Sequence, residues 1–224
     1  MASASSPTSP AWPIVAEIAG IDQGTAVLDV GCGTGGFCAL AAARGAAVHG
    51  VDGMADSIAR AGERVPTGDF RVALFERLPW DDDTFDVVTG FNSFQYALDP
   101  GAALEEACRV TRPGGSLAVC KYGRPAENEF FALLAALAPE RVDLSRLPES
   151  DNVDLAIEHL GQDVRASGVV PSAICFPSHA ALLAALQAAG IEALDRLPDT
   201  AGRFRQHSGG YRFEQSLKYR IIAV

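Results

Sequence analysis

Glycines and a carboxylate share residues 29–36, where the sequence reads DVGCGTGG. The glycines carry no Cβ, so the backbone there can approach a bound ligand closely. The apolar residues before Asp29 predict a strand, and the residues after Gly36 predict a helix whose first N–H groups are free to bind a ligand. This pattern predicts a site for a nucleotide-sized cofactor at the carboxyl edge of a parallel sheet.

A second carboxylate, Asp52, follows the apolar run 47–51 and ends another predicted strand. Its two acceptor oxygens suit the two neighbouring hydroxyls of a ribose. Asp52 could instead cap the helix predicted at 54–61, and the residues alone leave both roles open.

Strands and helices alternate along the rest of the chain. Strands are predicted at 26–30, 47–52, 70–76, 85–91, 116–122, 191–197 and 211–224, and helices at 14–20, 37–44, 54–61, 99–111 and 180–189. Helical stretches between strands indicate parallel strands with right-handed crossovers. We therefore expect a disordered leader at 1–13 and a single domain at 14–224. Residues 124–176, rich in Pro, Asp, Glu and Leu, form an insertion expected to fold into short helices.

Four motifs, in this order and spacing, resemble the class I S-adenosylmethionine-dependent methyltransferases, in the group typified by ubiquinone-biosynthesis and sterol enzymes. They are VLDVGCGTGGF at 27–37, VDGM at 51–54, LPWDDDTFDVV at 78–88 and DPGAALEEACRVTRPGG at 99–115. The closing YRFEQSLKYRIIAV resembles the last strand of some small-molecule members. The resemblance implies a doubly wound, Rossmann-like α/β fold. Its seven-stranded sheet would be mostly parallel with an antiparallel last strand, and residues 124–176 would add a helical lid.

The resemblance also implies S-adenosyl-L-methionine as the cofactor. The implied binding residues follow the predicted strands and are Asp29, Gly31, Gly33, Gly35, Asp52, Gly53, Met54, Leu74, Phe75, Glu76 and Asn92. In this scheme Asp29 anchors the loop, Asp52 accepts the ribose hydroxyls and Asn92 faces the transferable methyl. Leu74 departs from the family, which commonly has an acid there for the adenine amino group. Backbone groups or packing on Phe75 would then recognise adenine.

The acceptor is expected to be a small molecule with an O, N or C nucleophile, approaching from the carboxyl edge of the sheet. The expected acceptor contacts are Trp12, Gln95, Tyr96, Phe130 and Phe131. Apolar residues recur at helical spacing over 130–137. They predict either the inner face of a lid around a cyclic or aromatic acceptor or an ordinary core stripe.

No residue stands out as a catalytic base. A sulfonium already carries a good leaving group, so orientation and exclusion of water matter more. The weak candidates are His159, His207, Glu127, Glu129 and Tyr96. The acidic run 81–83 fits a solvated turn better than a metal cluster, and no metal is expected.

The composition argues against some classes of binding partner. A net charge of −10 without a basic stripe argues against nucleic acid. Five cysteines without a C-x-x-C pair indicate packing roles in a reducing compartment. No signal peptide and no apolar run of ~20 residues is found, so we expect a cytoplasmic monomer or homodimer without a membrane partner. Arginine outnumbers lysine sixteen to two, which indicates a GC-rich bacterial genome and favours a secondary metabolite as acceptor.

Two other functions fit parts of the pattern. Gly31, Gly33 and Gly36 also satisfy G-x-G-x-x-G with Asp52 downstream, as in an NAD-dependent oxidoreductase. A protein of the same fold could also bind the cofactor and catalyse a rearrangement or cyclisation, because fold does not fix function.

Overall fold

The computed structural model describes residues 9–123, 128–139, 150–188, 191 and 197–224. The chain divides into two compact units. The first comprises Met1–Lys121, Ser150–Val170 and Lys218–Val224, and the second comprises Tyr122–Glu149 and Pro171–Leu217.

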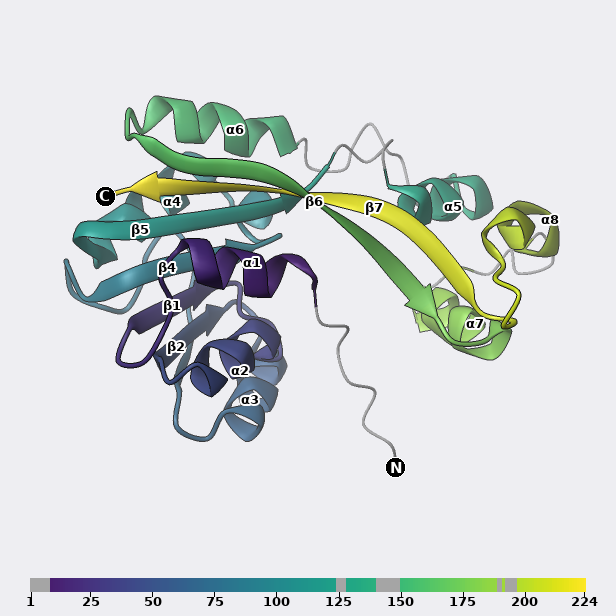
Figure 1. The fold of residues 1–224 in the computed structure, drawn as a ribbon, viewed down its shortest axis with the longest axis horizontal. Coiled ribbons are helices and arrows are strands. Elements are labelled where there is room, and N and C mark those ends of the chain that lie inside the picture. Colours follow the sequence, from purple (N-terminus) through teal and green to yellow (C-terminus); the bar gives the residue numbers. More distant parts are fainter. Residues whose placement is uncertain (1–8, 124–127, 140–149, 189–190, 192–196) are drawn as a thin grey trace. The chain divides into compact units, whose positions relative to one another are not determined.

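The sheet has seven strands in the order β3-β2-β1-β4-β5-β7-β6. The strands are β1 (Ala26–Val30), β2 (Ala47–Asp52), β3 (Asp69–Val72), β4 (Phe85–Phe91), β5 (Thr111–Tyr122), β6 (Val164–Phe176) and β7 (Tyr211–Ala223). Strands β1 to β5 pair in parallel, and β7 runs against its neighbours (Figure 1). This is the doubly wound arrangement with an antiparallel last strand that the sequence predicted. The long strands β6 and β7 each contribute residues to both units.

Helices cover both faces of the sheet in the first unit (Figure 1). One face carries α1 (Ala11–Ile18), α2 (Gly36–Ala43) and α3 (Ala55–Arg64), and the other carries α4 (Pro100–Val110) and α6 (Ser150–His159). A hydrophobic core lies on each face of the sheet, and alternate strand residues point into one or the other. Val27 packs toward α2, whereas Leu28 packs toward α4. Asp99 begins α4 as predicted, since its Oδ1 accepts the N–H groups of Gly101 and Ala102.

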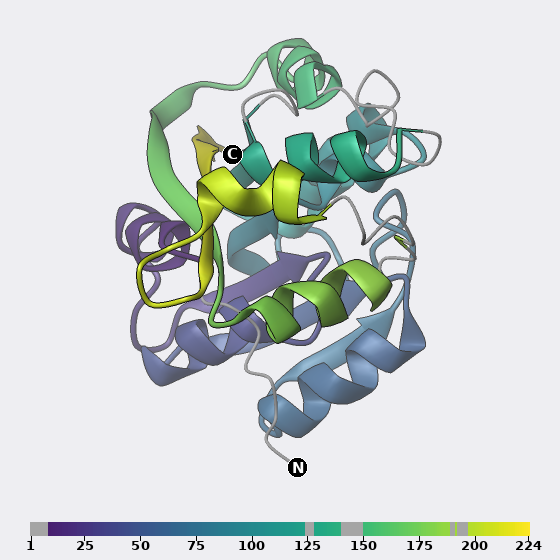
Figure 2. The same cartoon turned by 90° about the vertical axis from the view of Figure 1, so that its right-hand side faces the viewer.

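The second unit is built from helices α5 (Glu129–Leu137), α7 (His179–Ala188) and α8 (Leu197–Ala201), which Figure 2 shows face on. Asn128 caps α5 by accepting the N–H groups of Phe130 and Phe131. The core of this unit contains Leu133, Leu182 and Phe213. The apolar stripe of residues 130–137 therefore contributes to the core of this unit.

Three predictions about the elements are wrong. Helix α1 begins at Ala11, so residues 11–13 belong to a helix and not to a leader; residues 1–8 lie outside the described residues. The insertion 124–176 is not all helical, because β6 occupies its last part. The sixth strand is therefore Val164–Phe176 and not 191–197, most of which lies outside the described residues.

Strand β6 was not predicted because it contains Gly168 and Pro171, two residue types that are unfavourable in strands. A Cβ on Gly168 would lie 2.7 Å from the Tyr219 hydroxyl, so the glycine makes room for a ring of β7. Proline is tolerated because β6 is an edge strand. Within the described residues, no helix has the length and apolar character needed to cross a bilayer.

Candidate cofactor site

The glycine loop turns sharply over the end of β2. Gly31, Gly33 and Gly35 have φ of +74°, +52° and +76°, a region that L side chains disfavour. The N–H groups of Gly31 and Cys32 both donate to the carbonyl of Val51, at 2.8 and 3.0 Å. The loop is thereby fixed between the carboxyl ends of β1 and β2 (Figure 1).

The three glycines differ in what a side chain would meet. A Cβ on Gly31 would lie 2.3 Å from Ser93 Cβ, and one on Gly35 would lie 3.0 Å from Ala61 Cα. These two glycines allow protein packing. A Cβ on Gly33 would meet no atom of the described residues within 4 Å. Gly33 therefore borders a space that a ligand could fill, as a cofactor cradle requires.

Asp52 joins the glycine loop to α3. Its Oδ2 accepts the N–H of Gly33 at 3.1 Å, and its Oδ1 accepts the N–H of Met54 at 2.9 Å. Met54 directly precedes α3, so the bond from its N–H gives Asp52 the helix-capping role that the sequence left open. Each carboxylate oxygen can accept a further hydrogen bond. Asp52 can thus cap the helix and still receive ribose hydroxyls at the exposed turn of Gly53 and Met54.

Asp29 lies beneath this loop and is 3% exposed. Its Oδ1 accepts the hydroxyl of Thr89 at 2.8 Å, and its Oδ2 accepts the thiol of Cys38 at 3.8 Å. These bonds join β1 to β4 and to α2, and β1 and α2 are the elements on either side of the loop. The anchoring of the loop by Asp29 stays a prediction. Burial raises the pKa of Asp29 to about 7, against the lowering effect of the bonds from Thr89 and Cys38.

Buried polar atoms gather where β4 ends. Asn92 has φ of +54°, unusual for a residue other than glycine, and its N–H donates to Cys120 O at 2.7 Å. Asn92 Oδ1 and Ser93 Oγ are buried and have no hydrogen-bond partner within the described chain. Such orphaned polar atoms are costly unless a ligand or water pairs with them. Their position beside Gly31 fits the polar methionine portion of S-adenosylmethionine.

The three residues expected near adenine lie after β3. Leu74 is 59% exposed. Phe75 is partly buried, and its Cζ would lie 3.3 Å from a Cβ on Gly31, so its ring contacts the loop. Glu76 accepts the N–H of Asp99 at 3.1 Å. Phe75 is thus the one of the three that the structure brings to the glycine loop.

Gln95 and Tyr96 follow Asn92 in a short 3₁₀ helix, Phe94–Tyr96. Tyr96 is 63% exposed, which removes the alternative that it is a core residue. Trp12 instead packs its ring edge-on against Phe37 and Phe91, each with centroids at 6.3 Å. Trp12 therefore has a packing role between α1 and α2, and its contact with an acceptor stays a prediction.

The expected catalytic candidates are not gathered at the loop. His159 lies in the last turn of α6, just before Asp163, whose carbonyl accepts the N–H of Ala223. That end of β7 lies beside the start of β5, since Gly114 N donates to Val224 O at 2.6 Å. His159 therefore lies at the amino edge of the sheet, opposite the loop (Figure 1).

Tyr96, another candidate, belongs to the first unit, and the rest belong to the second unit or lie outside the described residues. His207 is exposed, and Glu129 accepts the N–H of Glu214 at 2.7 Å. Glu127 lies outside the described residues. Phe130 packs in the second unit with its ring centroid 5.3 Å from that of Phe213, and Phe131 packs edge-on against Tyr122.

Sequence analysis missed Thr89 and Ser93. Thr89 is fully buried in β4 and pairs with Asp29. The available signal was a polar residue inside the apolar strand 85–91; its register with Asp29 is given only by the structure. All five cysteines are free; Cys32, Cys38 and Cys120 are buried, as the predicted packing role requires, whereas Cys175 is exposed.

Comparisons with known proteins agree with this geometry. A family model described as a methyltransferase domain matches residues 28–119. A demethylmenaquinone methyltransferase of Clavibacter sepedonicus is 31% identical over 194 residues, covering 83% of this chain and 73% of that protein. The chain spans about half the length, 53%, of three mycobacterial relatives that it also matches.

Two solved structures share the fold. A candidate methyltransferase of Bacillus halodurans has a TM-score of 0.68 and 17% identity, over 94% of this chain and 97% of that one. The [4+2]-cyclase SpnF has a TM-score of 0.63 and 19% identity, over 96% of this chain and 81% of that one. At these identities the likeness concerns the fold alone.

Proposed function

Because the chain belongs to the class I S-adenosylmethionine-dependent methyltransferases, we propose that it methylates a small-molecule acceptor. The observation that carries this proposal is the pairing of Asp52 with the loop glycine Gly33, which itself borders open space. Family membership sets aside the NAD-dependent oxidoreductase.

The residues present fit the cofactor at three places. Asp52 would accept the ribose hydroxyls, and Gly33 would let the backbone approach the ligand. The orphaned oxygens of Asn92 and Ser93 would pair with polar groups of the methionine portion. Bound S-adenosylmethionine supplies a methyl on a positively charged sulfur, which is a good leaving group.

The protein's part in the reaction is to orient the acceptor and to exclude water. Asn92 holds the end of β4 by its bond to Cys120, and its strained backbone places its side chain where that strand stops. Gln95 and the exposed Tyr96 follow directly and would contact the acceptor. Phe131 is a further proposed contact: its ring packs edge-on against Tyr122, whereas Phe130 packs against the core of the second unit.

The acceptor class is proposed from the relatives. The Clavibacter protein is named for demethylmenaquinone, which is a quinone and therefore a cyclic molecule. We therefore propose that the acceptor is a cyclic or aromatic molecule, as expected from the sequence. We also propose that it is a bacterial secondary metabolite. We further propose a cytoplasmic location, supported by the five free cysteines, and a monomer or homodimer as the oligomeric state.

A direct test is transfer of an isotopically labelled methyl group. The purified chain, labelled S-adenosylmethionine and a panel of phenols, quinols, amines and carbon acids are incubated together, and products are detected by mass spectrometry. A labelled product supports the proposal. An unlabelled isomer of an acceptor would instead show a rearrangement or cyclisation, and no product over the whole panel would count against small-molecule methylation.

A further inference from the structure

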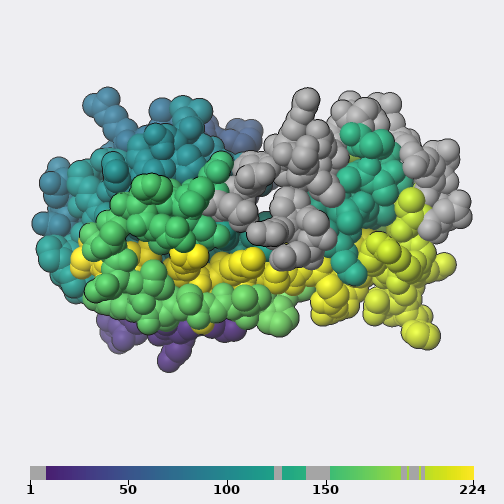
Figure 3. Space-filling view, turned by 90° about the horizontal axis from the view of Figure 1, so that it is seen from above, coloured from purple at the N-terminus to yellow at the C-terminus, as the bar shows by residue number. Residues whose placement is uncertain are grey.

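The only two lysines of the chain, Lys121 and Lys218, line one cavity. Sixteen other cationic residues are arginines, so lysine is rare and both copies meet at this place. The cavity measures about 270 Å³ and lies between α6 and strands β5, β7 and β6 of the first unit. Figure 3 looks onto this side, where the yellow atoms of β7 are seen between the green atoms of α6 and β6.

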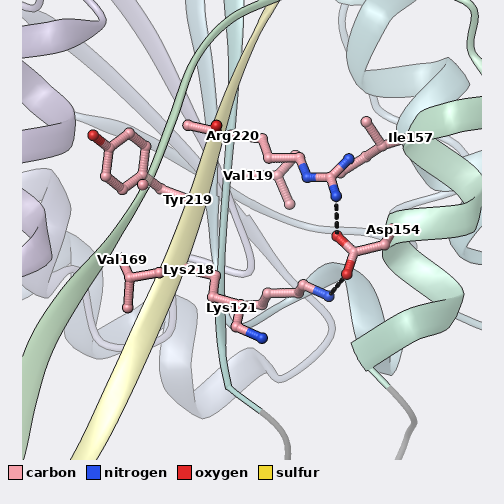
Figure 4. A pocket seen from close by; sticks show the side chains of 10 residues that line it. Val119, Lys121, Asp154, Ile157, Val169, Lys218, Tyr219 and Arg220 are labelled. Carbon is pink, nitrogen blue, oxygen red and sulfur yellow. Dashed lines mark hydrogen bonds and ion pairs between the residues drawn. The ribbon is translucent and has the colours of Figure 1, made fainter.

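Most charged side chains that line this cavity are positive. Its charged lining consists of Lys121, Lys218, Arg220 and one carboxylate, Asp154 (Figure 4). The described lining thus holds three cations and one anion, in a chain whose net charge is −10. Excess positive charge in a partly enclosed site disfavours folding through desolvation and repulsion, unless an anion binds there.

Within the described lining, the ion pairs of these cations involve a single carboxylate. Asp154 Oδ2 pairs with Lys121, which is 4% exposed, and Asp154 Oδ1 lies 3.3 Å from a guanidinium nitrogen of Arg220. One carboxylate is therefore shared by two cations. Lys218 Nζ has no hydrogen-bond or ion-pair partner in the part of the chain that the structure describes. A purely structural ion pair between α6 and β5 would need only Asp154 and Lys121.

The groove lies near the proposed methyl-transfer site. Lys121 follows Cys120, whose carbonyl accepts the N–H of Asn92 at 2.7 Å. Val119, also in the lining, pairs with Gly90 of β4. Because neighbouring strands are ~4.8 Å apart, β5 lies two strand spacings, about 10 Å, from the β1 end that carries the glycine loop, and β7, with Lys218 and Arg220, lies three spacings, about 14 Å, from it. The acceptor would have to extend over that distance.

We propose that this groove binds the carboxylate of a small acceptor and so sets the substrate class as carboxylate-bearing molecules. The inference rests on the proposed function and adds to it. Lys218 and Arg220 would contact the carboxylate, and buried Lys121 would hold Asp154 away from it. Val119, Ile157 and Val169 supply an apolar wall for a ring. Compact ammonium groups fit so narrow a space better than guanidinium groups do.

The rarity of lysine offers a direct test by NMR. Labelling with ¹⁵N-lysine gives two backbone amide signals, one from each of the neighbouring strands β5 and β7 that line the groove. Benzoate serves as the carboxylate probe, and benzamide is its neutral counterpart. We expect saturable shifts of both signals with benzoate and none with benzamide. Equal shifts with both probes, or none with either, would overturn the proposal.

Two variants test whether benzoate binds in this cavity. Arg220→Gln removes one cation, keeps both lysine signals and leaves Asp154 paired with Lys121. It should weaken benzoate binding by at least about tenfold. Arg60→Gln, on exposed α3, changes the net charge equally and should leave binding unchanged. Unchanged binding in Arg220→Gln would refute the assignment.

Calorimetry with S-adenosylhomocysteine on the same samples distinguishes failure of the carboxylate-site proposal from failure of the proposed methyltransferase function. Cofactor binding without benzoate binding would overturn only the carboxylate site. Absence of cofactor binding would contradict the proposed function whatever benzoate does.

Discussion

Asp52 Oδ2 accepts the backbone N–H of Gly33 at 3.1 Å, so the carboxylate that ends β2 is bonded to the loop that follows β1. The two features on which the cofactor prediction depended, far apart in sequence, thus form one site. The same carboxylate holds the start of α3 through Met54.

Replacing Asp52 should weaken cofactor binding. Asp52→Ala removes both acceptors for the ribose hydroxyls and should cost ~2–4 kcal/mol of binding free energy. Titration calorimetry with S-adenosylhomocysteine measures this loss. Asp56→Ala, an exposed acid in the first turn of the same helix, is the matched control and should bind normally. Normal affinity in Asp52→Ala would reduce the residue to a helix cap.

Gly33→Val should abolish cofactor binding, because a side chain would fill the open space beside the loop. It also strains a backbone with φ of +52°, which costs about 1–2 kcal/mol of stability. Gly20→Val separates the two effects, since Gly20 also has positive φ and open surroundings but lies in the turn after α1. We expect similar losses of melting temperature in both variants and loss of binding only in Gly33→Val. A Gly33 variant that binds normally would show that the loop is not the cradle.

Asp29 should make stability depend on pH in an unusual direction. Its pKa is raised to about 7 from 3.8, so the folded chain holds this proton where the unfolded chain has lost it. Stability from this group is therefore complete below about pH 4, falls as the pH rises toward 7 and is constant above. The full effect is of order 4 kcal/mol.

The measurement is urea unfolding of the wild type and Asp29→Asn across this pH range. The wild type should lose stability relative to the variant between about pH 4 and pH 7. Parallel curves for the two proteins would mean that the carboxyl group titrates normally.

Phe130 and Phe131 should respond differently to truncation. Phe130 packs with Phe176 and Phe213 in the core of the second unit, so Phe130→Ala should lose ~3–5 kcal/mol of stability. Phe131 contacts Tyr122 edge-on, and Phe131→Ala should retain more stability. Once an acceptor is known, Phe131→Ala should raise its KM and leave cofactor affinity nearly unchanged. A core-sized stability loss in Phe131→Ala with unaltered kinetics would refute its acceptor role.

The sequence predicts the cofactor half of the protein well, because its strands are apolar runs ended by glycine or aspartate. Strands β1, β2 and β4 and the cap of α4 at Asp99 all lie where the residues indicate. Strand β6 was not predictable from its pattern, since Gly168 is explained only by a ring of another strand. The place of His159 at the amino edge of the sheet likewise depends on the path of the chain, because a lone histidine carries no information about which edge it reaches.

Pairings between distant residues were also beyond the sequence. Thr89 and Asp29 become partners only through the register of β1 and β4. The two lysines are far apart along the chain and meet only because β7 inserts beside β5.

Calorimetric titration of the purified chain with S-adenosylhomocysteine, and separately with NADH, tests the central claim most directly. A ligand of the native state also raises the melting temperature by mass action, which gives an independent check. The account predicts saturable binding of S-adenosylhomocysteine, lost in Asp52→Ala and Gly33→Val, and no binding of NADH. Binding of NADH alone, or equal binding of S-adenosylhomocysteine by all three proteins, would contradict it.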